Sequence, residues 1–172
     1  QKVKLLSQVD QISHPDSRIA YESIDSSSAL AEYADCYQGL RTGDKDQFVI
    51  SFWEISQVDD GWEYIRSPNS SEKPWGGMSD VIFWEKGKGK LSYYAKLNRH
   101  KLHDMHESGN LAWGKKGIIV NEQGLKASLY CGSKFDASVS VLFPKSDEHL
   151  RALLVYCSSS EFVQDVRKLD RK

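Results

Sequence analysis

The change in hydrophobic period along the chain is the feature that most constrains its fold. From Asp80 to Pro144, apolar residues form short runs rich in β-branched and aromatic side chains, with glycines between the runs. Such runs are typical of strands joined by turns. After Ser146 the period lengthens, and Leu150, Leu153 and Cys157 recur at helical spacing. The order predicts an α+β fold: a curved, mainly antiparallel, half-barrel-like sheet with flanking helices and a C-terminal helical pair.

Local patterns predict several individual elements. A serine-rich helix start at Asp25–Ala29 is followed by "ALAEYADCYQ", which we expect to be a short helix. Residues 48–55 predict a strand, and the Gly-, Pro- and Ser-rich residues 59–80 predict mostly loop. "DVIFWEKGKGKLSYYAKL" at 80–97 predicts a hairpin with lysines at its tip. The polar residues 98–110 predict a short helix or loop.

The length of 172 residues fits one domain with a small appendage. We expect residues 1–34 to be an N-terminal linker or helical segment and residues 35–172 to be the main domain. No apolar run approaches the roughly 20 residues that cross a bilayer, and no secretory signal is recognisable. These features predict a cytoplasmic location without a membrane partner. Position 1 is Gln, which suggests a piece of a longer protein.

The net charge of −1 conceals a segregation of charge along the chain. Residues 1–83 carry 7 basic and 14 acidic side chains, whereas residues 84–134 carry 10 basic and 4 acidic ones. Binding surfaces for polyanions are local, so this distribution is compatible with a nucleic-acid partner. A solvated, lysine-rich surface is the plainer alternative.

Motifs for common enzyme chemistry are missing. The chain has no GxxxxGK[ST] phosphate loop, no GxGxxG between strand and helix, and no GxSxG. His100, His103 and His106 are the best metal candidates, but no cysteine pair lies nearby, so a polar segment facing solvent or DNA is the favoured interpretation. The three cysteines are widely spaced, which favours small buried hydrophobic residues.

Basic and aromatic residues alternate with polar ones in "WEKGKGKLSYYAK", "WGKKGIIVNEQGLKAS" and "CGSKF". Lysine and arginine neutralise phosphates, and arginine, asparagine and glutamine hydrogen-bond to base edges. The pattern is compatible with nucleic-acid binding, but aromatic residues beside lysines are also normal in sheets, where alternate residues face the core and water.

The segment "QGLRTGDKDQFVISFWEI", Gln38–Ile55, is similar to a segment of a known protein family. This stretch resembles the target recognition part of bacterial adenine-N6 DNA methyltransferases, the fused restriction-modification enzymes of type IIG and their PglX-like relatives in phage defence. The similar elements are Gly39, Leu40, Thr42, Gly43, Phe48 and the Trp53-Glu54 pair. Further similar segments follow in the same order: "DVIFWEKG", "NLAWGKKGI", "SLYCGSKFDASVSVLFP" and "HLRALLVYCSSSEF". Together they span about residues 35–165. The family's "W-Y-G" is replaced by "EKPWGGMSD", which leaves the role of Lys73–Gly77 open.

The resemblance implies a sequence-specific reader of double-stranded DNA. The family's [DNS]-P-P-[YFW] catalytic loop is not in this chain, since no two of its four prolines are adjacent. We therefore expect a non-catalytic fragment without a cofactor of its own. Its parent enzyme would use S-adenosylmethionine and flip the target adenine in a methyltransferase domain of the same chain. Whether that enzyme also cleaves DNA stays open.

The resemblance and the charge pattern lead to a set of candidate contact residues. We expect phosphate contacts from Lys86, Lys88, Lys90, Lys115 and Lys116. We expect base or groove contacts from Arg41, Arg99, Asn121 and Gln123. Two other functions stay open: a small enzyme of unrecognised class, and a protein-interaction domain that uses the aromatic residues near Trp62 and Trp75.

Overall fold

Two four-stranded sheets form the body of the protein. The computed structural model describes residues 5–12, 30–58, 61–68 and 76–169. The first sheet has only antiparallel neighbours, in the order β1 (Ala34–Gln38), β8 (Val139–Pro144), β5 (Gly117–Asn121) and β6 (Ala127–Tyr130). The second sheet runs β2 (Val49–Ser51), β4 (Asp80–Phe83), β3 (Trp62–Arg66) and β7 (Lys134–Phe135), and only its β3–β7 pair is parallel. The predicted α+β class is confirmed, with the strands divided between two sheets.

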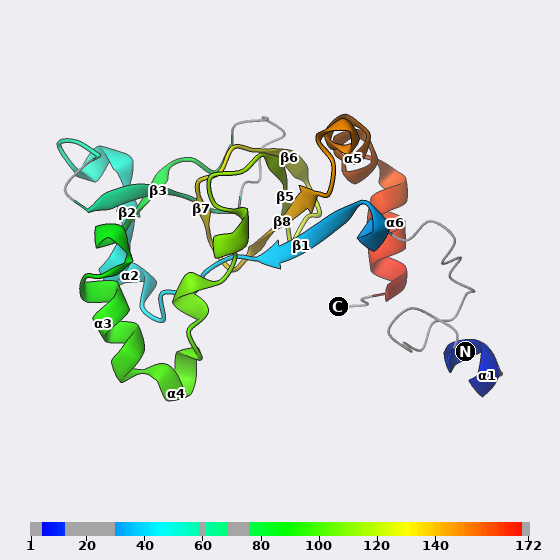
Figure 1. Cartoon of the computed structure of the whole chain (residues 1–172), viewed down its shortest axis with the longest axis horizontal. Helices are drawn as coiled ribbons and strands as arrows, with labels where there is room; N and C mark the ends of the chain where they lie inside the picture. Colours follow the sequence, from blue (N-terminus) through cyan, green and yellow to red (C-terminus); the bar gives the residue numbers. More distant parts are fainter. Residues whose placement is uncertain (1–4, 13–29, 59–60, 69–75, 170–172) are drawn as a thin grey trace.

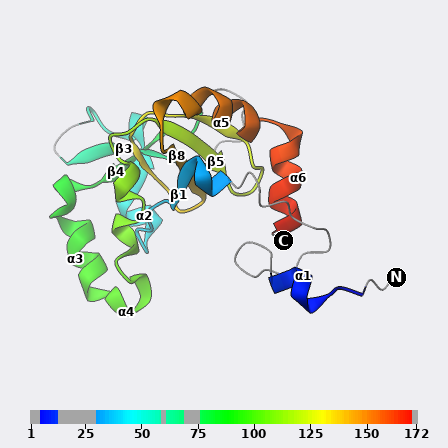
Figure 2. The ribbon, with the colours of Figure 1, turned by 45° about the vertical axis from the view of Figure 1, so that its right-hand side comes forward.

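The helices give the molecule the outline of an arch (Figures 1 and 2). The α-helices are α1 (Gln8–Ile12), α2 (Lys45–Phe48), α3 (Lys90–Leu97), α4 (Arg99–Leu102), α5 (Leu150–Cys157) and α6 (Ser160–Leu169). Within the described residues, six 3₁₀ turns accompany them: η2 (Leu30–Glu32), η3 (Phe52–Glu54), η4 (Glu85–Gly87), η5 (Met105–Glu107), η6 (Asn110–Ala112) and η7 (Asp147–His149). The sheets form the top of the arch, α3 and α4 form one leg, and α6 forms the other. None of the helices described could span a membrane.

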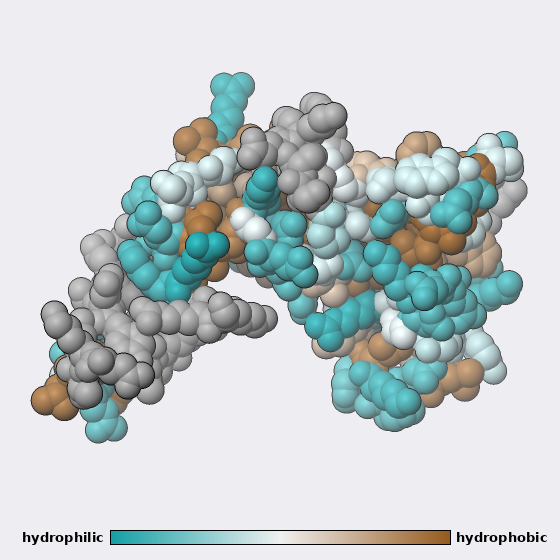
Figure 3. All heavy atoms as spheres, turned by 180° about the vertical axis from the view of Figure 1, so that it is seen from behind, coloured by the Kyte–Doolittle hydropathy of each residue, from teal (hydrophilic) through white to brown (hydrophobic). Residues whose placement is uncertain are grey.

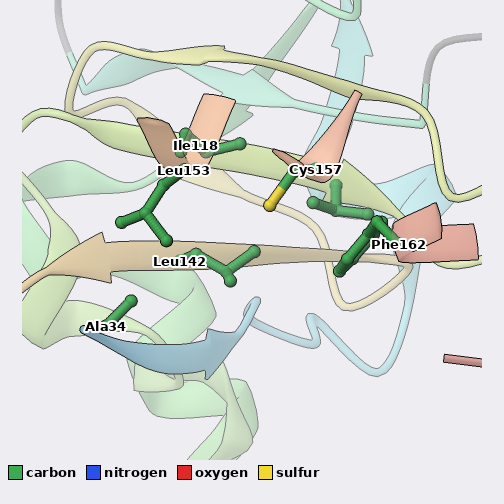
Figure 4. Packing of buried hydrophobic residues seen from close by; sticks show 7 residues of the cluster. Ala34, Ile118, Leu142, Leu153, Cys157 and Phe162 are labelled. Atoms are coloured by element: carbon green, nitrogen blue, oxygen red, sulfur yellow. The ribbon is translucent and has the colours of Figure 1, made fainter. Parts of the chain in front are cut away.

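One hydrophobic cluster fixes the C-terminal helical pair to the first sheet (Figure 4). Ile118 of β5 and Leu142 of β8 point toward Leu153 and Cys157 of α5 and Phe162 of α6. All five side chains are at least 95% buried. Because complete burial of a large apolar side chain stabilises a fold by about 1.5–3 kcal/mol, this cluster explains why the predicted helical pair forms. That prediction is confirmed.

The opposite face of the first sheet is buried as well. Ile119 of β5 and Val141 of β8 pack there against Phe135 and Ala112. Both faces of β5 are thus covered, which accounts for its uninterrupted apolar sequence "GIIV". A third cluster contains Leu40, Phe48, Ile82, Trp84 and Leu91, and it joins α2 and α3 to the second sheet.

The predicted hairpin at residues 80–97 is wrong. Only its first arm is a strand, β4, and the second arm is helix α3. Leu91 and Ala95 lie one helical turn apart and are both at least 98% buried, so a helix buries this segment better than a strand would. Between β4 and α3 the chain reverses through Glu85, Lys86 and Gly87, all of which have positive φ.

Three other expected elements also differ. Residues 34–38 form strand β1 instead of a helix, and the segment predicted to be mostly loop contains β3. The strand predicted over residues 48–55 is only three residues long, and Trp53, within that predicted strand, is 66% exposed. Residues 98–110, for which either a short helix or a loop was expected, contain the short helix α4. The helix start at Asp25–Ala29 and residues 73–75 lie outside the described residues.

A half-buried tyrosine connects the two C-terminal helices. The Tyr156 hydroxyl of α5 donates a hydrogen bond to Asp165 Oδ2 of α6 at 3.0 Å. Burial, and then the bond to Asp165, raise the pKa of Tyr156 to about 12. An unfolded tyrosine has a pKa of about 10, so the neutral form is favoured in the folded state. The stabilisation is complete below about pH 10 and is lost as the pH rises toward 12.

An alkaline titration followed by tyrosinate absorbance tests this difference. Tyr156 should ionise well above the exposed tyrosines among the eight in the chain, and Tyr156→Phe should remove a late-titrating group. Tyr156→Phe should also reduce the loss of stability between about pH 10 and 12. Tyr93→Phe is the control, because Tyr93 is 67% exposed. An unchanged late phase in Tyr156→Phe would contradict the assignment.

Candidate nucleic-acid interface

A groove opens where the terminal helices leave the first sheet uncovered. Side chains at alternate positions of a strand share a face, so Ala34, Cys36 and Gln38 of β1 all point to the side that carries α5 and α6. The β1–β8 register pairs Cys36 with Leu142 and Gln38 with Ser140. At the Ala34 end this face is packed under the helices. At the Gln38 end it is open.

The groove has a volume of about 1260 Å³, an apolar floor and a polar rim. Helix α6 forms one wall. The described residues of the floor are Leu30, Cys36, Val120, Leu125, Ser140, Leu142, Phe162 and Val166. The described polar residues along the rim are Gln38, Arg41, Glu122, Gln123, Gln164, Arg167 and Lys168. The molecule is also visibly hollowed between the two legs of the arch (Figure 3).

The cations of the rim outnumber its single carboxylate. The described cations of the rim are Arg41, Arg167 and Lys168, and its described carboxylate is Glu122. Lys168 pairs with Asp165 at 3.0 Å. Neither Arg41 nor Arg167 pairs through its guanidinium with any residue in the described part of the chain. Unpaired guanidinium groups beside exposed amides are suited to an anionic partner that also accepts hydrogen bonds.

Arg41 lies where the sheet meets the leg formed by α3 and α4. Its backbone N–H donates to the Met105 carbonyl at 2.9 Å, and that carbonyl belongs to η5, which follows α4 in the chain. Leu40, the preceding residue, is completely buried. The next glycine, Gly43, has φ +78° and packs against Leu102 of α4. This loop is therefore anchored on both sides, and Arg41 itself is exposed.

Gln123 and Asn121 have different roles in one turn. The Asn121 side chain accepts a hydrogen bond from the Gln123 backbone N–H at 2.9 Å, which shapes the turn between β5 and β6. Gln123 is exposed and lies on the groove, whereas Asn121 lines a small cavity with Arg66 and Ser128. The structure thus places Gln123 with Arg41 and places Asn121 behind the turn.

A second group of predicted contacts gathers on the leg formed by α3 and α4. We call the exposed basic residues of this leg the lysine lobe: Lys86, Lys88, Lys90, Lys96, Arg99 and Lys101. The lobe contains four of the predicted residues, but on a turn and two helices in place of a hairpin tip. Arg99 is bonded to Asp104 at 2.7 Å, so its charge is partly neutralised.

The turn that carries Lys86 is held by its neighbours. Glu85 and Lys86 adopt φ of +47° and +56°, which are costly for residues with a Cβ. The backbone N–H groups of Trp84 and Glu85 both donate to the Gly61 carbonyl, at 2.7 and 2.9 Å. The Glu85 carboxylate accepts the Lys90 backbone N–H at 2.6 Å at the start of α3. Lys86 and Lys88 are thereby presented to solvent.

Lys115 and Lys116 are not brought to the groove. They precede β5, whereas Gln123 follows it, so the strand separates them. Lys115 lies over the Phe143 ring at 4.6 Å, and both lysines are exposed. They form a separate basic site at the far end of the strand.

The histidine series does not converge. His100 and His103 are exposed, whereas His106 is buried with its Nδ1 unbonded. Within the described residues, no group of three His, Cys, Asp or Glu side chains is arranged to hold a metal ion. The expectation of a wholly solvent- or DNA-facing segment is therefore wrong for His106. Among the cysteines only Cys157 is buried, and burial raises the pKa of its thiol to about 11.

Five of the described polar residues of the groove were missed in the sequence: Gln38, Glu122, Gln164, Arg167 and Lys168. In the sequence, Arg167 and Lys168 fit the end of a helix, where basic residues suit the dipole. The alternation of Cys36 and Gln38 would have been informative only if β1 had been recognised as a strand. No protein-family model matches the chain, and no curated protein is significantly similar to it in sequence.

Proposed function

We propose that this chain recognises double-stranded DNA in a sequence-specific manner, as the target recognition domain of a bacterial adenine-N6 DNA methyltransferase or restriction-modification enzyme. The observation that carries the proposal is the groove on the first sheet. There, Arg41 and Gln123, from segments far apart in the sequence, line the same groove as Arg167 of α6. Side chains of these types contact phosphates and base edges in protein–DNA complexes.

The lysine lobe supports the same partner. It places exposed cations on one leg of the arch, and Arg167 and Lys168 place cations on the other. A duplex lying across the arch would meet both legs through its phosphates and the groove through its base edges. Such a division of contacts is usual, since phosphate contacts position a protein and base contacts provide specificity.

The chemistry would then belong to another part of the parent enzyme. A methyltransferase domain of the same chain would bind S-adenosylmethionine and flip the adenine, while this domain holds the duplex in register. The domain itself would need no cofactor and would catalyse no reaction. An enzyme of this kind works in the cytoplasm, where bacterial DNA is found.

A salt titration of DNA binding tests the proposal. Fluorescence anisotropy with a duplex of random sequence should give a log–log slope of several units between low and physiological salt. Arg41→Gln combined with Arg167→Gln should reduce the magnitude of that slope by about 2, since each lost phosphate contact removes about one released counterion. Arg151→Gln is the matched control, because Arg151 is exposed on α5 and does not line the groove.

The outcomes of this titration distinguish binding through the groove from binding through the lysine lobe. If the chain binds no duplex even at low salt, the proposal is wrong. If binding is steep in salt but unaffected by the double variant, the groove is not the interface. Lys86→Gln with Lys88→Gln then shows whether the lysine lobe carries the phosphate contacts.

A further inference from the structure

The turn between β5 and β6 holds an amide that nothing in the described structure uses. Gln123 is exposed on the rim of the groove, and none of the described residues hydrogen-bonds to its side-chain amide. Its backbone is constrained on both sides: its own N–H donates to Asn121 Oδ1 at 2.9 Å, and the Glu122 N–H donates to the Ser138 carbonyl at 3.1 Å. The backbone that carries the Gln123 amide is therefore fixed, and the amide itself is free to bind an external partner.

Two residues later, the same turn directs an apolar side chain into the groove. Leu125 has φ +50°, a left-handed backbone conformation that is unfavourable for a residue with a bulky side chain. Its N–H is bonded to the Asn121 carbonyl at 2.8 Å. Its side chain lies against the cluster under α5 and α6 and lines the groove beside Gln123. The strained backbone therefore keeps an amide and an apolar group side by side.

We propose that this turn reads an A·T base pair, with Gln123 hydrogen-bonding to the adenine and Leu125 contacting the thymine methyl group. The NH2 group of a glutamine amide can donate to adenine N7 while its carbonyl oxygen accepts from adenine N6–H in the major groove. The thymine of the same pair carries its C5-methyl there, and that methyl is matched by an apolar contact. The inference rests on the proposed function and adds the identity of a base pair to it.

The surroundings of the turn support this assignment over a G·C pair. Guanine presents two acceptors in the major groove, so it is matched by arginine, and cytosine presents a donor. Arg41 lies elsewhere on the rim and is available for phosphate or guanine at another position. Leu125, two residues after Gln123, lines the groove floor and offers cytosine no acceptor, whereas the Glu122 carboxylate on the rim is an acceptor that the Gln123 variants leave unchanged. Arg167, on the opposite wall, is placed to neutralise a phosphate.

Selection from a pool of duplexes with a randomised central segment tests the assignment. The full chain should enrich sequences with at least one position fixed as A·T. Gln123→Ala should lose the preference at one such position by about tenfold or more, since a bidentate base contact discriminates by about 1–3 kcal/mol and 1.4 kcal/mol is a factor of ten. Gln57→Ala, at an exposed glutamine that does not line the groove, should leave the selected motif unchanged.

A change of preference provides the sharper test. Gln123→Arg should convert the preferred pair at that position from A·T to G·C, because arginine pairs with guanine O6 and N7. An unfolded variant could not produce this result. If the wild-type chain selects a motif but both variants select the same motif, the inference is wrong and the proposed function stands. If duplexes bind but no motif emerges, the sequence specificity of the proposed function fails together with the inference. If the wild-type chain binds no duplex, the proposed function itself has failed.

Discussion

Gly39→Ala should lower the free energy of unfolding by about 3 kcal/mol or more, because the added methyl group has no space. A Cβ at position 39 would lie 2.1 Å from the Asp136 carbonyl oxygen and 2.4 Å from that of Phe135. Both atoms are backbone, so no rotamer change can relieve the clash. On either side of the contact, Gly39 N–H donates to the Val139 carbonyl and Leu40 N–H donates to the Phe135 carbonyl at 2.9 Å.

Urea unfolding followed by circular dichroism measures this effect, with Gly124→Ala as the control. A Cβ at position 124 would meet only Lys126 Cγ, at 3.8 Å, and Gly124 is not among the glycines with positive φ. Gly124→Ala should therefore change stability by no more than about 1 kcal/mol. Because Gly39 also fixes the loop that presents Arg41, the Gly39 variant should bind DNA more weakly even where it remains folded. Equal stabilities of the two variants would show that the loop does not cross the 135–139 segment this closely.

The sequence predicted those elements whose apolar pattern matches what they bury. Phe162 and Val166 lie one helical turn apart, and both pack on the first sheet, so α6 was recognisable from its period. Strands β5 and β8 were recognisable because both of their faces are covered, which leaves a dense apolar run.

Two elements with one exposed face were predicted wrongly: a strand was predicted as a helix, and a helix was predicted as a strand. Residues 34–38 follow good helix formers, yet they form the edge strand β1, in which only Ala34 is buried. Residues 90–97 carry two adjacent tyrosines, which favour a strand, yet the burial of Leu91 and Ala95 fixes a helix. In both segments tertiary packing outweighs intrinsic preference, which amounts to less than about 1 kcal/mol per residue.

The groove could be anticipated only in part. Arg41 and Gln123 were identified by residue type and by the resemblance. That they line the same groove depends on the strand register, because Gln38 of β1 and Val120 of β5 both pair with Ser140 of β8. The groove exists because α5 and α6 cover only one end of that face. This coverage follows from helix length and docking position, neither of which is encoded in a local pattern.

Lys134→Met should lower the free energy of unfolding by about 2 kcal/mol, although it replaces a lysine by an apolar side chain of similar size. Lys134 is 92% buried, and its ammonium lies 4.7 Å from the centroids of both the Trp84 and the Trp113 rings. The two rings meet edge to face at 5.2 Å. The Glu63 carboxylate, 2.5 Å away, closes the site. The variant removes two cation–π contacts and leaves that carboxylate without its cation.

Lys115→Met is a demanding control for this prediction. Lys115 also lies over an aromatic ring, that of Phe143 at 4.6 Å, but its side chain is exposed, so its loss should cost no more than about 0.5–1 kcal/mol. Urea unfolding gives both values. Near-ultraviolet circular dichroism should report a change of the Trp84–Trp113 pair in Lys134→Met alone.

A double-mutant cycle identifies what Lys134 contributes. Glu63→Gln alone should cost less than Lys134→Met, because Glu63 is 43% exposed and water can solvate what remains. If the pair acts as a unit, the double variant should be less destabilised than the sum of the two single variants. Additive costs would instead assign the stabilisation to the tryptophan rings. Trp84 directly precedes the turn that carries Lys86 and Lys88. The cycle therefore shows whether the ion pair with Glu63 or the contact with the tryptophan rings stabilises the base of the lysine lobe.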